Sequence, residues 1–207
     1  MISVLIADDQ ALIRQALAAL VALEPDIEVV GQAADPAAAV ELAGRLRPDV
    51  VLMDVQMAPP DGPPADGIAA TAAIRRANPG VRVIILTTFG RPGYLRRAME
   101  AGAVGFLVKD APADQLVEGI RRVHRGLRVV DPALAADSLS LGSSPLSERE
   151  TEVLAAAAQG GSTGVIARVV HLSEGTVRNH LSAAMGKLGA ATRAEAVRMA
   201  TDNGWLS

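Results

Sequence analysis

Length, composition and charge narrow the class of protein. The chain has 207 residues, 50% of them hydrophobic, which is enough for one large or two modest globular domains with buried cores. The absence of cysteine excludes disulfides and thiolate metal sites and agrees with a reducing compartment. The net charge is -3, and residues 138–207 hold six basic and six acidic side chains, so gross charge gives no sign of a nucleic-acid partner.

The apolar runs are short. No basic leader precedes the first of them, and none approaches the roughly 18 residues that span a bilayer. We therefore expect a soluble, cytoplasmic protein that does not enter a membrane.

Short apolar runs alternate with alanine-rich helical segments through residue 125. This alternation predicts an α/β domain in which a doubly wound, five-stranded parallel sheet is covered by five helices. The expected strands are residues 2–7, 27–33, 49–53, 81–86 and 105–108, and the expected helices are residues 11–23, 36–47, 68–78, 93–101 and 113–125.

Polar side chains follow four of these strands. Asp8 and Asp9 follow the first strand, Asp54 the third, Thr87 the fourth and Lys109 the fifth. Parallel strands end on the same side of a sheet, and ligands bind in the crevice outside those ends, so we expect one acidic pocket with a hydroxyl and a lysine beside it. A single acid after a strand is usually a solvated loop residue, but the four elements together favour a shared site.

Clustered carboxylates repel one another, so this pocket requires a cation or a protonated group. Mg²⁺ takes about six oxygen ligands near 2 Å and retains several waters. We expect Asp9 and Asp54 to bind Mg²⁺ directly, Asp8 to bind it through water, and the backbone carbonyl of Gln56 to add a further oxygen.

Asp54 is central among the expected strand ends, where a carboxylate oxygen can attack a phosphoryl group. Thr87 can then donate a hydrogen bond to the bound phosphate, and Lys109 can supply a positive charge.

Residues 126–145 have the composition of a linker, with an Asp131-Pro132 step, a Ser/Gly-rich stretch and room for one helical turn near residues 133–136. Beyond it the pattern predicts a small all-α bundle, in which Ser147 and Glu150 form a capping box. We therefore divide the chain into domains at 1–125 and 146–207, joined by the linker. The expected helices of the second domain are residues 148–159, 164–170, 174–188 and 193–203.

Three residues of this bundle have the spacing of a helix-turn-helix: Ala167, Leu172 and Val177. The helix that follows the turn has an apolar stripe, and Arg178 and Asn179 lie off it, where they can reach base edges. An ordinary solvated helix face is the alternative. The candidate DNA-binding residues are Thr163, Ser173, Thr176, Arg178, Asn179, His180 and Ser182, of which Thr163, Ser173, Thr176 and His180 are assigned to phosphates.

The first domain resembles the receiver domain of two-component response regulators, which has a flavodoxin-like fold. The resemblance rests on residues 8–9 (DD), 53–57 (MDVQM), 86–89 (LTTF) and 101–110 (AGAVGFLVKD). It implies that a sensor histidine kinase phosphorylates Asp54, that Mg²⁺ is the cofactor, and that Phe106 is the switch aromatic, although a plain core aromatic is the alternative for Phe106.

One segment departs from the receiver pattern. The chain carries about five extra residues with four prolines between Pro59 and Gly67, close to the expected phosphorylation site. Proline is stiff and cannot donate a backbone hydrogen bond. We hypothesise that this insert changes the access or the lifetime of the phosphoryl group.

The second domain resembles the LuxR-type DNA-binding domain, and the two together resemble the NarL/FixJ family of response regulators, with an ending like that of its DesR-like branch. Val165 stands where that family generally has Glu, so the first helix of the motif is expected to be less firmly held. The resemblance rests on residues 146–150 (LSERE), 166–167 (IA), 172–181 (LSEGTVRNHL), 187–189 (KLG), 193–196 (RAEA) and 204–206 (GWL).

These observations predict a phosphorylation-switched transcription regulator that is not an enzyme and that binds double-stranded promoter DNA as a homodimer. In the resembled family the receivers pair, often through their first and fifth helices. A phosphate-independent regulator with a receiver used for dimerisation is one alternative. An aspartyl-phosphate hydrolase is another, although such enzymes have a second Asp two residues after the nucleophile, where this chain has Gln56.

Overall fold

The structure is a computed structural model, which describes residues 1–57, 67–88, 92–140 and 144–206. The chain divides into two compact units: residues 1–90 and 97–135 form a sheet unit, and residues 136–207 together with 91–96 form a helical unit. Within the described ranges, no helix is both long enough and apolar enough to cross a membrane.

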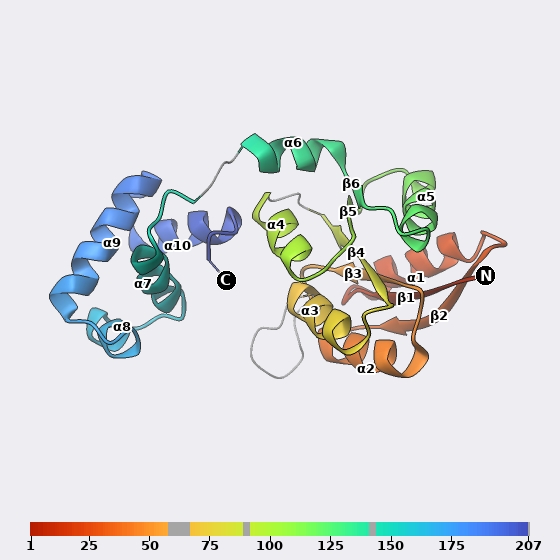
Figure 1. The fold of residues 1–207 in the computed structure, drawn as a ribbon, viewed down its shortest axis with the longest axis horizontal. Helices are drawn as coiled ribbons and strands as arrows, with labels where there is room; N and C mark the ends of the chain where they lie inside the picture. The colour runs from red at the N-terminus through yellow and green to blue at the C-terminus, as the bar shows by residue number, and fades with distance from the viewer. Residues whose placement is uncertain (58–66, 89–91, 141–143, 207) are drawn as a thin grey trace. The chain divides into compact units, whose positions relative to one another are not determined.

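The sheet unit contains a parallel sheet with strand order β2-β1-β3-β4-β5-β6 (Figure 1). The order reverses beside β1, which lies between β2 and β3, as in doubly wound folds. The strands are β1 (Ile2–Ala7), β2 (Ile27–Ala33), β3 (Val50–Asp54), β4 (Arg82–Thr87), β5 (Gly105–Val108) and β6 (Val129–Val130).

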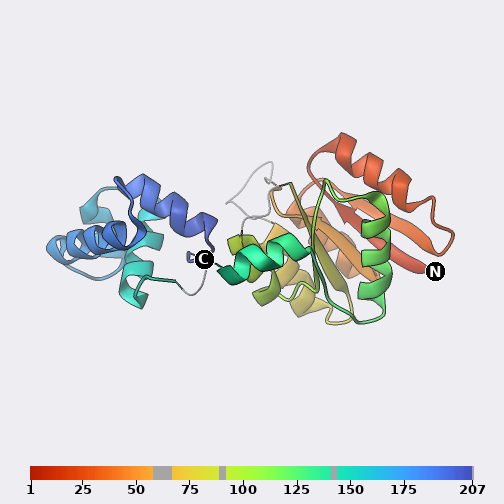
Figure 2. The same ribbon diagram turned by 90° about the horizontal axis from the view of Figure 1, so that it is seen from above.

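Helices cover both faces of this sheet (Figures 1 and 2). On one face, alternate strand residues such as Val4, Leu52 and Ile84 form a core with apolar side chains of α1 and α5, because successive side chains of a strand point to opposite faces. The opposite face carries α2 and α3. The helices of this part of the chain are α1 (Ala11–Val21), α2 (Pro36–Leu46), α3 (Gly67–Ala77), α4 (Pro92–Glu100) and α5 (Ala113–His124).

The predicted strand count of five is wrong by one. β6 has only two residues and pairs in parallel with β5, through the registers Gly105–Val129 and Phe106–Val130. A run of two residues is too short to show the alternation of side chains that identifies a strand.

The segment expected as a linker also contains α6 (Pro132–Ser140), whose start is stabilised because the Asp131 carboxylate accepts the N–H groups of Ala133 and Leu134.

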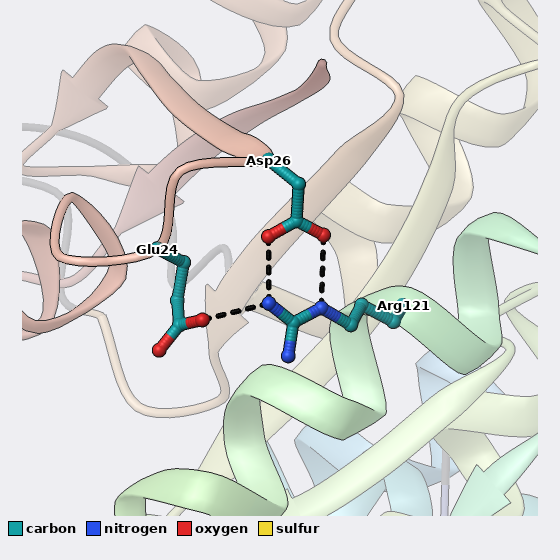
Figure 3. A network of polar contacts seen from close by, with 3 residues as sticks. All are labelled: Glu24, Asp26 and Arg121. Atoms are coloured by element: carbon teal, nitrogen blue, oxygen red, sulfur yellow. Dashed lines mark hydrogen bonds and ion pairs between the residues drawn. The ribbon is translucent and has the colours of Figure 1, made fainter.

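Arg121 of α5 joins that helix to the turn between α1 and β2 (Figure 3). Its Nε and one terminal nitrogen donate to the two carboxylate oxygens of Asp26, at 2.9 and 2.6 Å, and the terminal nitrogen also lies 2.7 Å from Glu24. A planar guanidinium matches a carboxylate in this two-bond geometry, so the contact orients α5 as well as attracting it.

The helical unit contains α7 (Glu148–Ala158), α8 (Thr163–Val169), α9 (Glu174–Leu188) and α10 (Arg193–Asp202). Each begins after a Ser or Thr whose hydroxyl accepts a backbone N–H: Ser147, Ser162, Ser173 and Thr192. The turn between α8 and α9 includes His171, which has a φ of 54°. Apolar side chains of all four helices form one core.

Candidate functional site

The ends of β1 and β3 bring three carboxylates together. Asp8 and Asp54 are buried, with 1% and 3% of their surface exposed, whereas Asp9 is exposed. One carboxylate oxygen from each of the three lies within 4.8 Å of the others. The side chains therefore have the types and spacing that a divalent cation requires.

Lys109 follows β5 and places its ammonium between two of these carboxylates. Its Nζ lies 2.7 Å from Asp8 Oδ2 and 2.9 Å from Asp54 Oδ2, and 8% of the side chain is exposed. One positive charge is thus shared by two buried negative charges, with a third carboxylate close by.

The pKa values of Asp54 and Lys109 both depart from their ordinary values in this pocket. Burial raises the pKa of Asp54 above its ordinary value of 3.8; hydrogen bonding and charge from Lys109 oppose the rise, and the charge of Asp8 adds to it. Burial disfavours the ammonium of Lys109, but its hydrogen bonds to Asp8 and Asp54 and their negative charges together outweigh that effect and raise the pKa of Lys109. An added cation would relieve the excess negative charge.

Three other predicted residues belong to the same domain. Thr87, at the end of β4, is 2% exposed, and its carbonyl accepts the Lys109 N–H at 2.8 Å. Gln56 is exposed, and its backbone N–H donates to the Asp54 carboxylate. Phe106 is fully buried in β5, between its neighbours β4 and β6.

Arg14 is a pocket residue that the sequence reasoning missed. One of its terminal nitrogens donates to the backbone carbonyl of Asp8 at 2.6 Å, and the Gln10 N–H donates to Asp8 Oδ1 at 2.9 Å. With Lys109 on Oδ2, Asp8 is held at three atoms. The available signal was a cation in the first turn of the helix that begins just after the acidic pair.

Gly67, the first residue of α3, approaches the backbone of Asp54. Its N–H donates to the Val55 carbonyl at 3.0 Å, and a Cβ at this position would lie 1.8 Å from the Asp54 carbonyl oxygen. Only glycine fits there.

The hypothesis that the insert between Pro59 and Gly67 changes the access or the lifetime of the phosphoryl group concerns residues 58–66, which lie outside the described residues.

The predicted DNA-facing helix is α9. Its buried stripe consists of Val177, Leu181, Ala184 and Leu188, as its spacing predicted. The candidate residues lie off this stripe. Arg178, Asn179, Ser173 and Ser182 are exposed, and Thr163, Thr176 and His180 are half-buried.

Some of these polar groups already have partners. The hydroxyl of Ser173 accepts the Thr176 N–H at 3.1 Å and lies 2.8 Å from the Thr176 hydroxyl. Arg178 Nε donates to the Glu174 carbonyl one turn earlier. Thr163 begins α8, which forms over seven residues although Val165 replaces the Glu expected there.

Two families match this chain. Residues 4–121 match the response regulator receiver domain, and residues 144–200 match the bacterial regulatory proteins of the luxR family. The transcriptional regulatory protein DesR of Bacillus subtilis (strain 168) is 40% identical over 206 residues, which cover 100% of both chains.

Solved structures agree with this match. The response regulator ChrA of a heme-sensing two-component system is 35% identical, with 97% of this chain and 96% of that chain covered and a TM-score of 0.58. A complex of the two-component response regulator RcsB with DNA is 25% identical, with 97% and 98% covered and a TM-score of 0.70.

Both predicted resemblances are confirmed, and the hydrolase alternative is set aside. The chain belongs to the LuxR family of two-component response regulators, which are transcription regulators, not enzymes, and which join a receiver domain to a helix-turn-helix DNA-binding domain.

Proposed function

We propose that Asp54 accepts the phosphoryl group through which a sensor histidine kinase controls this transcription regulator. The observation that carries the proposal is the convergence of Asp8, Asp9, Asp54 and Lys109 at one edge of the sheet. An Asp54 oxygen forms the new bond to phosphorus as the bond from phosphorus to the kinase imidazole breaks. Lys109 then compensates the charge of the phosphate, and the Thr87 hydroxyl donates to it.

Mg²⁺ is the proposed cofactor, because three carboxylates share one lysine and hard oxygen ligands suit this ion. Asp9 and Asp54 would bind it directly together with the Gln56 carbonyl. Asp8 is held by Lys109, Gln10 and Arg14, which supports its assignment as a water-mediated ligand. When bound, the ion supplies the positive charge that offsets the incoming phosphoryl oxygens.

The proposed output is binding of a phosphorylated homodimer to promoter DNA in the cytoplasm. On α1, Leu12 is 78% exposed and Ala16 and Ala19 are also exposed, and Leu23 in the turn after the helix is 81% exposed, which gives an apolar surface suited to pairing beside α5. Two copies could then read half-sites about one helical turn apart. Thr87 and Phe106 are the proposed switch pair that couples phosphate to pairing.

The proposed reading residues are Arg178, Asn179 and Ser182, with Thr163, Ser173, Thr176 and His180 on phosphates. We propose the domain limits 1–125 and 146–207 with a connecting segment at 126–145 that includes β6 and α6. The Pro-rich insert is proposed to tune access to Asp54.

Labelling with acetyl phosphate, or with a cognate kinase, tests this function. Asp54→Asn should abolish the label and the gain in DNA affinity that the label produces. Asp49→Asn is the matched control: Asp49 precedes the same strand and lies at its other end, where its carboxylate accepts from Ser3.

Label that persists in Asp54→Asn would refute the acceptor assignment. DNA affinity that is equal with and without label would favour the phosphate-independent alternative.

A further inference from the structure

Glu150 is the buried acidic residue that the phosphorylation site does not use. Among the described residues, the buried polar side chains are Asp8, Asp54, Thr71, Thr87 and Glu150, and 6% of Glu150 is exposed. Burying a carboxylate is costly unless it is paired and hydrogen-bonded. Its partners therefore indicate what the residue does.

One oxygen of Glu150 holds two elements of the helical unit. Oε2 accepts the Ser147 N–H at the start of α7 and, from 37 residues along the chain, the ammonium of Lys187 in the last turn of α9, each at 2.7 Å. Lys187 and Ser147 lower the pKa of Glu150, so the carboxylate is charged near neutral pH. The side chain of Lys187 is 43% exposed.

The contact adds a directional restraint to the packing of α9. The apolar stripe buries one face of α9 in the core of the bundle, and hydrophobic attraction itself has no preferred direction. The ion pair with Glu150 is directional and acts at one end of α9. Arg178 lies nine residues before Lys187, or roughly 14 Å along the axis at about 1.5 Å per residue, so a small tilt at Lys187 displaces Arg178.

We propose that Glu150 is a positioning residue for DNA reading, which sets the orientation of α9 through Lys187 and thereby places Arg178 and Asn179 against base edges. This inference rests on the proposed role of α9. Glu150 itself does not contact DNA, and Lys187 is committed to the bundle and not to a phosphate.

Glu150→Gln tests the proposal in the full chain. The amide oxygen can still accept the Ser147 N–H, while the charge on Lys187 loses its partner. Two duplexes serve as probes: one selected with the wild-type protein from a random pool, and a scrambled duplex of equal composition. Affinity for the selected duplex should fall about tenfold, and affinity for the scrambled duplex should stay within about twofold, because orientation affects base reading and not phosphate attraction.

Lys187→Gln and the double variant with Glu150→Gln test whether Glu150 acts through Lys187. If Lys187 acts only through Glu150, Lys187→Gln should lower specific affinity as Glu150→Gln does, and the double variant should lose little more. Lys187→Arg keeps the charge and should remain within about twofold of wild type. Glu195→Gln is the matched control, since Glu195 accepts the Ala191 N–H beside the Thr192 cap of α10.

Two outcomes would overturn the proposal. One is an equal loss on both duplexes in Glu150→Gln that remains folded by circular dichroism. The other is a second loss of affinity of the same size when Lys187→Gln is added to Glu150→Gln, which would make Lys187 a phosphate contact. If Glu150→Gln does not fold, the partly exposed Lys187 still decides the matter, through the selected-to-scrambled ratio of Lys187→Gln. A wild-type chain that selects no duplex would overturn the proposed DNA function as well.

Discussion

The two candidate sites are built in opposite ways. The acidic pocket of the sheet unit assembles mostly buried side chains from strand ends that are distant in sequence, whereas the proposed DNA-facing surface of the helical unit consists mainly of exposed or half-buried side chains of α9. In the pocket, charge and fold are coupled, because Lys109 after β5 pairs with carboxylates at the ends of β1 and β3. On α9, the inward stripe packs the helix into the core, and the exposed residues off the stripe lie outside that core.

Removal of the shared lysine tests the coupling in the pocket most severely. Lys109→Met leaves the buried Asp8 and Asp54 without their cation, and breaking such a pair costs about 3 to 5 kcal/mol. Urea denaturation should show this loss without divalent ions, and millimolar-range Mg²⁺ should recover more stability in the variant than it adds to wild type. Equal effects of Mg²⁺ on both proteins would mean that ion and lysine do not share the same carboxylates.

Gly67→Ala should be the next largest effect. Its Cβ would lie 1.8 Å from the Asp54 carbonyl oxygen, and such overpacking costs about 1 to 3 kcal/mol or more. Urea denaturation and phosphoryl labelling should both be impaired. Gly44→Ala in α2 is the control, because a Cβ there meets nothing within 4 Å and should stabilise the helix by up to about 1 kcal/mol. A benign Gly67→Ala would show that α3 can move away from Asp54.

Arg178→Ala and Asn179→Ala should leave stability nearly unchanged, since both side chains are exposed. Each should weaken binding to a selected duplex by about 1 to 3 kcal/mol if it reads bases. Titrations with selected and scrambled duplexes make the measurement. An equal loss on both would reassign the residue to the backbone, and a loss of folding would contradict the division between inward and outward residues of α9.

Asp26→Asn should have the smallest effect, and one that depends on pH. The hydrogen bonds from Arg121 lower the pKa of Asp26 below its ordinary 3.8 in the folded chain (Figure 3). The stability that this carboxylate adds is therefore fully present above its unfolded pKa and is lost as pH falls through the lower folded pKa. Urea denaturation should separate wild type from Asp26→Asn near neutral pH, less so in high salt, and the curves should converge once the pH falls below the lowered folded pKa of Asp26.

The sheet was predictable because its signals are repeated. Apolar runs such as residues 2–7 and 49–53 are bounded by helical segments. Because these strands run in the same direction, Asp8 and Asp54 lie at the same edge of the sheet. β6 was not predictable, because Val129 and Val130 become a strand only through pairing with β5. The capping box of Ser147 and Glu150 was recognised from local spacing and is present in the structure.

The remaining features depend on contacts that no local pattern contains. The spacing of Ser147 and Glu150 reveals the cap but not the ammonium of Lys187, which arrives from a different helix. In the same way, the local sequence around Arg14 does not show that its side chain donates to the Asp8 carbonyl. Directional partners of this kind are set by tertiary packing, so the elements were easier to predict than the connections between them.

The hydrogen bond from the Gly67 N–H to the Val55 carbonyl ties the start of α3 to the residue that follows β3. Together with the close approach of Gly67 to the Asp54 backbone, it restrains the proposed acceptor from residues on either side of the Pro-rich insert. We therefore expect that a change in the length of the insert that preserves this bond leaves the position of Asp54 unchanged.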